Sequence, residues 1–156
     1  MTARQRGASL IEVLVALLVM SIGLLGAAAI QLNALKFTDS SALRTKASFI
    51  AYDMMDRIRA NPDGAYALAS LDAAPGSGSL NAPATQDLYD FKANITATLP
   101  DGTGVIAKTG YVYTITVGWN DARAATAVNS SNASSTETAT QSFVLTSRVA
   151  MDAVTQ

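Results

Sequence analysis

The chain opens with a long, uninterrupted apolar stretch. A short leader with two arginines precedes Glu12, and no charged residue occurs from Val13 to Leu35. As an α-helix rising about 1.5 Å per residue, residues 13–35 would be about 35 Å long, which is enough to cross a hydrocarbon core of about 30 Å. The pattern therefore predicts a membrane-spanning helix whose basic N-terminal end stays on the cytoplasmic side.

A second apolar pattern extends this helix beyond the membrane. Its members recur at three- and four-residue steps, as on one face of an amphipathic helix: Leu43, Ala47, Ile50, Met54 and Ile58. Asp53 and Arg57 stand four residues apart and are expected to pair. Pro62, within a turn signal at residues 61–64, ends the pattern. One helix of about 80 Å is thus predicted over residues 8–60.

The C-terminal part shows three patterns of alternating apolar and polar residues, at 91–99, 111–119 and 142–149. Such short runs, with a turn at Pro100-Asp101-Gly102, predict an antiparallel sheet. Its apolar face and the amphipathic helix face are natural partners, so the aromatic residues are expected in the core. The expected fold is α+β, with a long N-terminal helix packed on a small antiparallel sheet.

Two further segments are predicted to be loops. Residues 62–90 are rich in Ala, Gly, Ser, Pro and Asp, and a connection of this length is either a contact surface or simply flexible. The small, polar residues between Asp121 and Thr140 predict a mobile loop.

Composition excludes several functions. The 156 residues include no histidine and no cysteine, which removes thiol chemistry, histidine acid–base catalysis and the common zinc and iron–sulfur sites. The aspartates follow no calcium-loop spacing, so no metal, cofactor or enzymatic activity is expected. The net charge is -1 with scattered basic residues, and nucleic acid is not an expected partner.

The position of Glu12 separates three interpretations of the N-terminus. A permanent single-span anchor accounts for the length of the apolar run, and a secretory signal cleaved near Ala27-Ala28-Ala29 accounts for the small residues there. Neither explains a carboxylate at the start of the run, because a carboxylate inside a membrane costs about 2.5 to 3.5 kcal/mol at the centre.

The third interpretation takes Gly7, Ala8, Glu12 and the apolar run together. This arrangement resembles the class III signal of type IV prepilins and pseudopilins. The resemblance implies that a prepilin peptidase cleaves between Gly7 and Ala8 and methylates the new amine of Ala8. It also implies that Glu12 pairs with the N-terminal amine of a neighbouring subunit and sets the assembly register, a role for which a desolvated charge pair is suited.

A narrower resemblance covers residues 51–62, 9–18 and 21–26. These stretches are similar to PilV-type minor pilins, also called type IV pilus modification proteins. Near the predicted helix end, charged residues alternate in sign and are either a solvated face or a contact made between subunits: Asp53, Asp56, Arg57 and Arg59.

The resemblance implies four parts: a cleaved leader at 1–7, a transmembrane and filament-core helix at 8–35, an amphipathic half at 36–61 and a globular domain at 62–156. It implies a minor pilin that takes part in type IV pilus assembly or initiation, twitching motility and adhesion. The implied partners are the prepilin peptidase, other minor and major pilins, the inner-membrane assembly platform and membrane lipid. The protein would cross the inner membrane once, with a periplasmic domain, and then enter the pilus. The alternatives are a type II secretion minor pseudopilin and a pilus-tip adhesive or DNA-binding module.

Overall fold

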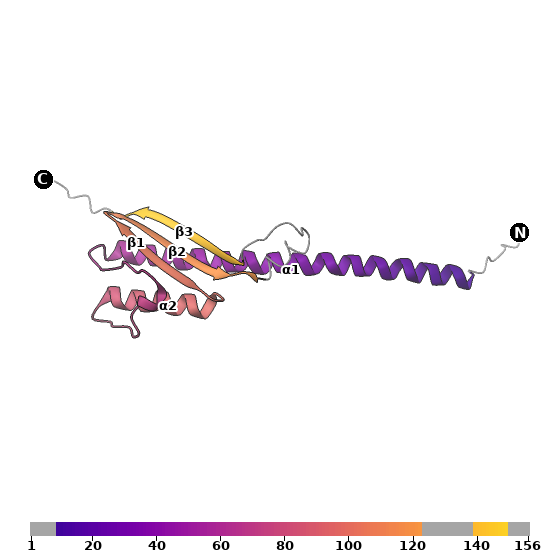
Figure 1. The fold of residues 1–156 in the computed structure, drawn as a ribbon, viewed down its shortest axis with the longest axis horizontal. Coiled ribbons are helices and arrows are strands. Elements are labelled where there is room, and N and C mark those ends of the chain that lie inside the picture. The colour runs from indigo at the N-terminus through magenta and orange to yellow at the C-terminus, as the bar shows by residue number, and fades with distance from the viewer. Residues whose placement is uncertain (1–8, 123–138, 150–156) are drawn as a thin grey trace, which may run out of the picture.

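The computed structural model describes residues 9–122 and 139–149, and shows a long helix that projects from a small α+β domain (Figure 1). The elements follow in the order α1 (Leu10–Ala60), η1 (Leu71–Ala73), α2 (Pro83–Thr98), β1 (Thr103–Thr109), β2 (Val112–Asn120) and β3 (Thr140–Arg148). The C-terminal half of α1 packs on the domain, and the N-terminal half extends away from it. The expected fold class is confirmed.

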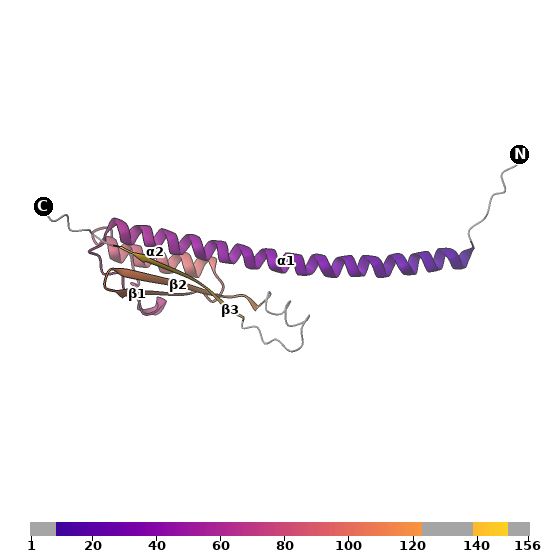
Figure 2. The same ribbon diagram turned by 90° about the horizontal axis from the view of Figure 1, so that it is seen from above.

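Helix α1 runs without interruption for 51 residues. It contains no proline, curves gently and shows no sharp kink, so Ser21, Gly23 and Gly26 do not break it (Figure 2). The helix ends at Ala60, where Asn61 follows as the C-cap and Pro62 cannot continue the pattern. The predicted helix end at residue 60 is confirmed.

The sheet is antiparallel with the strand order β1-β2-β3. Strands β1 and β2 are joined through Gly110, whose φ of 60° lies in the left-handed region that glycine adopts without a steric penalty. The register places Ile115 of β2 between Ile106 of β1 and Leu145 of β3. The strands predicted at 111–119 and 142–149 are confirmed within one or two residues.

The core lies between the sheet, the C-terminal half of α1 and helix α2. Helix α1 contributes the predicted face, with Ile50 only partly buried and with Ala51 and Met55 fully buried in addition. Strand β2 supplies four of the buried residues, namely Tyr113, Ile115, Val117 and Trp119. The core aromatics are Tyr66, Phe91, Tyr113 and Trp119, whereas Phe37, Phe49, Tyr52 and Tyr111 are exposed.

The strand predicted at 91–99 is wrong, because these residues belong to α2 and to its C-cap, Leu99. Phe91 and Ile95 fit both a two-residue and a four-residue repeat, but Leu88 extends only the helical one, and all three are buried. Ala93 and Ala97, which a strand would place beside them, are exposed. Pro83 in the first turn is a helix-start signal that the strand prediction ignored.

The prediction of a long loop at 62–90 is also wrong in extent. Leu68 and Ile106 exchange two backbone hydrogen bonds, with N–O distances of 2.9 and 2.8 Å. The segment also contains η1 and the fully buried Tyr66, and α2 begins at Pro83. Most of the loop predicted between Asp121 and Thr140 lies outside the described residues.

Strand β1 was not predicted, because few of its inward positions carry an apolar side chain. Ile106 is one of them, and Gly104 is another. A Cβ atom on Gly104 would come within 2.8 Å of side-chain atoms of both Leu71 and Phe91. Glycine is therefore required here by close packing of η1 and α2 on the strand, which a periodicity of apolar residues cannot reveal.

Candidate assembly site on the N-terminal helix

The first turn of α1 is held by Ser9 and contains Glu12. Ser9 is the N-cap with extended backbone, and its Oγ accepts a hydrogen bond from the backbone N–H of Glu12 at 3.4 Å. A serine followed three residues later by a glutamate is the capping-box pattern, and a carboxylate in the first turn interacts favourably with the helix dipole. Sequence reasoning missed this role of Ser9, although the Ser-x-x-Glu spacing indicates it.

The part of α1 that follows Glu12 is apolar and exposed. Leu10 is 85% exposed, and the most apolar window of the helix, with a mean hydropathy of 2.7, has none of its residues buried against the rest of the described chain. By length and composition this helix can cross a membrane. An apolar surface of this size needs a cover of lipid or of other protein chains.

The polar side chains within and just beyond this segment are satisfied locally. Ser21 Oγ donates to the backbone oxygen of Leu17 at 2.7 Å, and Thr38 Oγ1 donates to that of Ala34 at 3.0 Å. Such bonds remove the cost of placing a hydroxyl in an apolar environment. Added Cβ atoms at Gly23 and Gly26 would meet no other atom within 4 Å, so both glycines lower the helix surface where another chain could approach.

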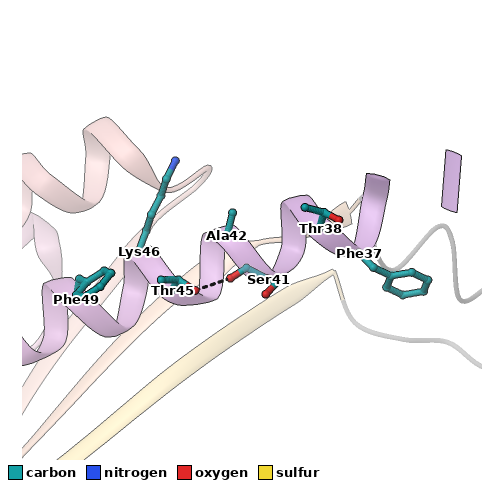
Figure 3. Close-up of a pocket in the computed structure, with 7 residues that line it drawn as sticks. All are labelled: Phe37, Thr38, Ser41, Ala42, Thr45, Lys46 and Phe49. Atoms are coloured by element: carbon teal, nitrogen blue, oxygen red, sulfur yellow. Dashed lines mark hydrogen bonds between the residues drawn. The ribbon is translucent and has the colours of Figure 1, made fainter. Parts of the chain in front are cut away.

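A shallow hollow lies on α1 between two exposed aromatic side chains, Phe37 and Phe49 (Figure 3). Besides Lys46, the residues that line the hollow between them are small: Thr38, Ser41, Ala42 and Thr45. Lys46 is the one charged residue of this lining, and its side chain extends away from the helix (Figure 3). The hollow is open and lies where α1 leaves its apolar segment, so it continues the exposed surface rather than forming an enclosed ligand site.

The four charged residues predicted at the end of α1 divide into two groups. Asp53 and Arg57 pair at 2.9 Å as expected, but the Nη1 of Arg57 also contacts Asp87 at 2.8 Å and Asp90 at 3.1 Å, both on α2. The hydrogen bond to Asp87, together with the charge of Asp53, raises the pKa of Arg57 further above its ordinary value against the effect of burial. This guanidinium therefore links the two helices within one chain.

Arg59 forms the second group, with Asp56 at 2.8 Å and with the Oγ of Ser147 on β3 at 2.9 Å. The side chains of Asp56 and Arg59 are 71% and 49% exposed. An ion pair this accessible to water contributes little to stability, so it remains suited to a contact with another molecule.

Tyr66 extends the Arg57 cluster into the segment before η1. Its hydroxyl donates to Asp87 Oδ2 at 2.7 Å and accepts from Asn61 Nδ2 at 3.2 Å. Burial and the hydrogen bond to Asp87 raise the pKa of Tyr66 to about 12. Sequence reasoning missed Tyr66, Asp87 and Asp90, because it assigned residues 62–90 to a loop.

Gly7 and Ala8, the expected cleavage and methylation site, lie outside the described residues. Across residues 9–122 and 139–149, no group of three or more Asp, Glu, His or Cys side chains could hold a metal ion.

Residues 2–28 match the family described as the prokaryotic N-terminal methylation motif. The match contains Gly7, Ala8, Glu12 and the apolar segment as far as residue 28, so the chain carries a type IV prepilin-like N-terminus. No curated protein and no solved structure matches the chain. The motif and the fold together therefore support a type IV pilin-like or pseudopilin-like structural protein. The residues after the motif add no sequence similarity to this support.

Proposed function

We propose that this chain is a minor pilin of the PilV type, built into a type IV pilus or into the complex that initiates it. One observation carries the assignment to the pilins: the prepilin-like motif at residues 2–28 includes the start of a helix whose first buried residue is Leu43. A soluble domain would not leave so long an apolar helix uncovered. Membrane lipid before assembly, and other pilin helices after it, would provide that cover.

Processing would begin at the inner membrane, with the N-terminus in the cytoplasm and the domain in the periplasm. The prepilin peptidase would cleave after Gly7 and methylate the amine of Ala8. Glu12 would then pair with the amine of a neighbouring subunit. Its place in the first, exposed turn of α1 supports this role, because the carboxylate is accessible from outside the chain.

The PilV-type assignment rests on the resemblance of residues 51–62, 9–18 and 21–26. Of the charged residues within 51–62, Asp56 and Arg59 are the stronger candidates for a contact with other minor or major pilins, because both are exposed. Asp53 and Arg57 contribute to the same surface, with Arg57 held by α2. Delivery to the assembly platform, twitching motility and adhesion are the processes in which this subunit would take part.

N-terminal mass spectrometry tests the proposal, on protein taken separately from membranes and from sheared surface filaments. Methylated Ala8 in the filaments is the expected result. Methylated Ala8 found only in membranes would instead favour a pseudopilin of type II secretion or a component of the initiation complex. An intact Met1, or a chain that starts near Ile30, would contradict a pilin altogether. A variant that leaves piliation intact but abolishes surface binding would identify a tip module.

A further inference from the structure

The outer edge of β3 has backbone groups that the described chain does not use. β3 is the last strand of the sheet, on the side away from β1 (Figure 1). Val149 N donates to Tyr111 O at 2.8 Å, and Asp121 N donates to Ala139 O at 2.6 Å. In an antiparallel ladder residues alternate between facing the partner strand and facing away, so the odd-numbered residues of β3 bond to β2.

The even-numbered residues of β3 therefore direct their N–H and C=O groups away from the sheet: Thr140, Ser142, Val144, Thr146 and Arg148. Within residues 9–122 and 139–149, no backbone group bonds to this outward row. It consists of small or β-branched residues apart from Arg148, and it contains no proline. Natural sheets usually protect an edge with charges, proline or a covering segment, and this edge has one charge at its end.

The opposite edge of the same sheet is paired at its middle. By the same alternation, Ile106 of β1 directs its backbone groups outward, and Leu68 takes both of them in hydrogen bonds. η1 follows directly and packs its Leu71 against the same strand. Within residues 9–122 and 139–149, the chain thus pairs with the outer edge of β1 at Ile106, whereas none of its backbone groups pairs with the outer edge of β3.

The apolar core is also incomplete at the β3 edge. Tyr113, Ile115 and Val117 of β2 are at most 1% exposed, whereas Phe143 and Leu145 beside them on β3 are only partly buried. Tyr52 of α1, whose ring centre lies 6.2 Å from that of Phe143, is 52% exposed. One more strand beside β3 would place side chains over these three apolar groups.

We propose that the β3 edge binds an extended strand of a different polypeptide, which adds to the sheet antiparallel to β3. A partner strand would use the outward N–H and C=O groups of the edge, and the antiparallel arrangement is slightly more stable per residue than the parallel one. Main-chain hydrogen bonds of this kind provide affinity without a deep pocket. The strand would carry apolar residues at alternate positions, facing Tyr52, Phe143 and Leu145. It would carry an acidic residue near its N-terminal end, where it meets Arg148.

A second copy of this chain fits the edge poorly. β3 runs in the same direction as α1, because it starts near the middle of the helix and reaches Ser147 beside Arg59 (Figure 1). Two β3 edges paired antiparallel would direct their two α1 helices in opposite directions. They could then not enter one membrane or one filament side by side. This exclusion of a second copy rests on the proposed function, whereas the open edge does not.

Amide hydrogen exchange resolved to single residues tests the proposal. The full-length protein is compared in detergent micelles after purification, in native membranes and in sheared filaments. The outward amides of Ser142, Val144 and Thr146 should exchange at least about tenfold more slowly in membranes or filaments than in micelles, since a hydrogen-bonded amide must open before it exchanges. Equal rates in all three samples would overturn the proposal. So would slow exchange in micelles that accompanies dimer formation by light scattering, which would make the edge an interface between copies.

Proline at position 144 provides a variant that acts on the outer edge alone. Val144→Pro removes an outward N–H, and proline is accepted on edge strands where the N–H faces away from the sheet. It should abolish the added protection of Ser142 and Thr146. Val144→Ala keeps the N–H, so the added protection of Ser142 and Thr146 should remain in this variant. If Val144→Pro changes the circular dichroism melting curve, Thr146→Pro repeats the test at the next outward position. Protection that persists in folded proline variants would contradict strand addition.

The two proposals fail separately. Absence of the protein from filaments, with outward amides protected in membranes, would overturn the pilus assignment and support the strand site. Methylated protein in filaments, with outward β3 amides that exchange as fast as in micelles, would support the pilus assignment and overturn the strand site.

Discussion

The guanidinium of Arg57 on α1 lies 2.8 Å from the carboxylate of Asp87 on α2, and the same carboxylate accepts the hydroxyl of Tyr66. Asp87 therefore receives hydrogen bonds from two segments that enclose it, the end of the long helix and the chain that leaves it. The contact fixes α2 against α1 beside the apolar packing of Leu88 and Phe91.

Replacing Arg57 should destabilise the domain more than replacing its neighbour. Arg57→Ala would leave Asp87 and Asp90 partly buried and without their cation. The expected loss in the free energy of unfolding is about 2 kcal/mol, which lies between the values for exposed and for buried ion pairs. Arg59→Ala removes an exposed pair and should cost less than about 1 kcal/mol. Denaturant unfolding of the full-length protein in detergent measures both. Equal losses of unfolding free energy in the two variants would show that the contacts of Arg57 with α2 stabilise the domain no more than the exposed pair of Arg59 does.

Tyr66 should make the fold sensitive to alkaline pH. Its pKa is raised to about 12 in the folded chain from an ordinary value of 10.0, so folding favours the protonated hydroxyl. The associated stability is fully present below pH 10 and is lost as the pH rises through 12, by about 3 kcal/mol at most. Thermal melts across this range measure the loss.

Tyr66→Phe is the matched control for that measurement. It removes the titrating group together with its two hydrogen bonds, so we expect a pH-independent cost of about 1 kcal/mol and a shallower decline above pH 10. An unchanged decline in this variant would assign the alkaline loss to other groups.

Substitutions on α2 distinguish a helix from a strand. Phe91→Ala should cost about 3 to 5 kcal/mol, because the side chain is buried in the core. Ala93→Lys and Ala97→Lys should change stability by less than about 0.5 kcal/mol, since both positions are exposed on the helix. On a strand both alanines would share the buried face with Phe91, and lysine there would be disruptive. Unfolding midpoints of the three variants decide between the two.

Glu12 can contribute to the helix cap and to charge pairing between subunits, and replacing it with glutamine distinguishes the two. Glu12→Gln keeps a residue that fits a capping box but removes the charge, whereas Ser9→Ala removes the cap and keeps the charge. If charge pairing sets the register, the glutamine variant should be cleaved and methylated normally but enter filaments at least about tenfold less. The Ser9→Ala variant should enter nearly normally, at a cost of about 1 kcal/mol to the helix start. Immunoblots of sheared filaments and membranes measure both, and the opposite ranking would assign Glu12 to capping.

Sequence patterns predicted the elements in which one periodicity was unambiguous. The end of α1 was predicted because apolar steps of three and four residues stop at a proline, and β2 because alternating Tyr113, Ile115 and Val117 fit no helix. The prediction for residues 91–99 failed because Phe91 and Ile95 satisfy both periods, and only the burial of Leu88 in the core extends the helical one. β1 was missed because its close approach to α2 requires Gly104, which carries no side chain to reveal a pattern.

In the candidate site, too, some residues could be predicted from the sequence and others could not. Gly7, Ala8 and Glu12 could be proposed from the sequence because their spacing is local, and the prepilin-like motif that they suggested matches over residues 2–28. The partners of Arg57 were missed because Asp87 and Asp90 lie about thirty residues further along the chain and meet it only after α2 has packed. Local spacing thus indicates motifs that act on other molecules, whereas contacts within the domain depend on the fold.

The late start of burial along α1 has a mechanical consequence. Because the buried residues of this helix begin at Leu43 and end at Ile58, a pull on its N-terminal half reaches the domain through a stripe about 20 Å long. Such a pull runs along the stripe, so it loads all contacts from Leu43 to Ile58 in shear rather than opening them one by one. The unbroken hydrogen bonding of α1 carries that load to the stripe without a weak point at a proline.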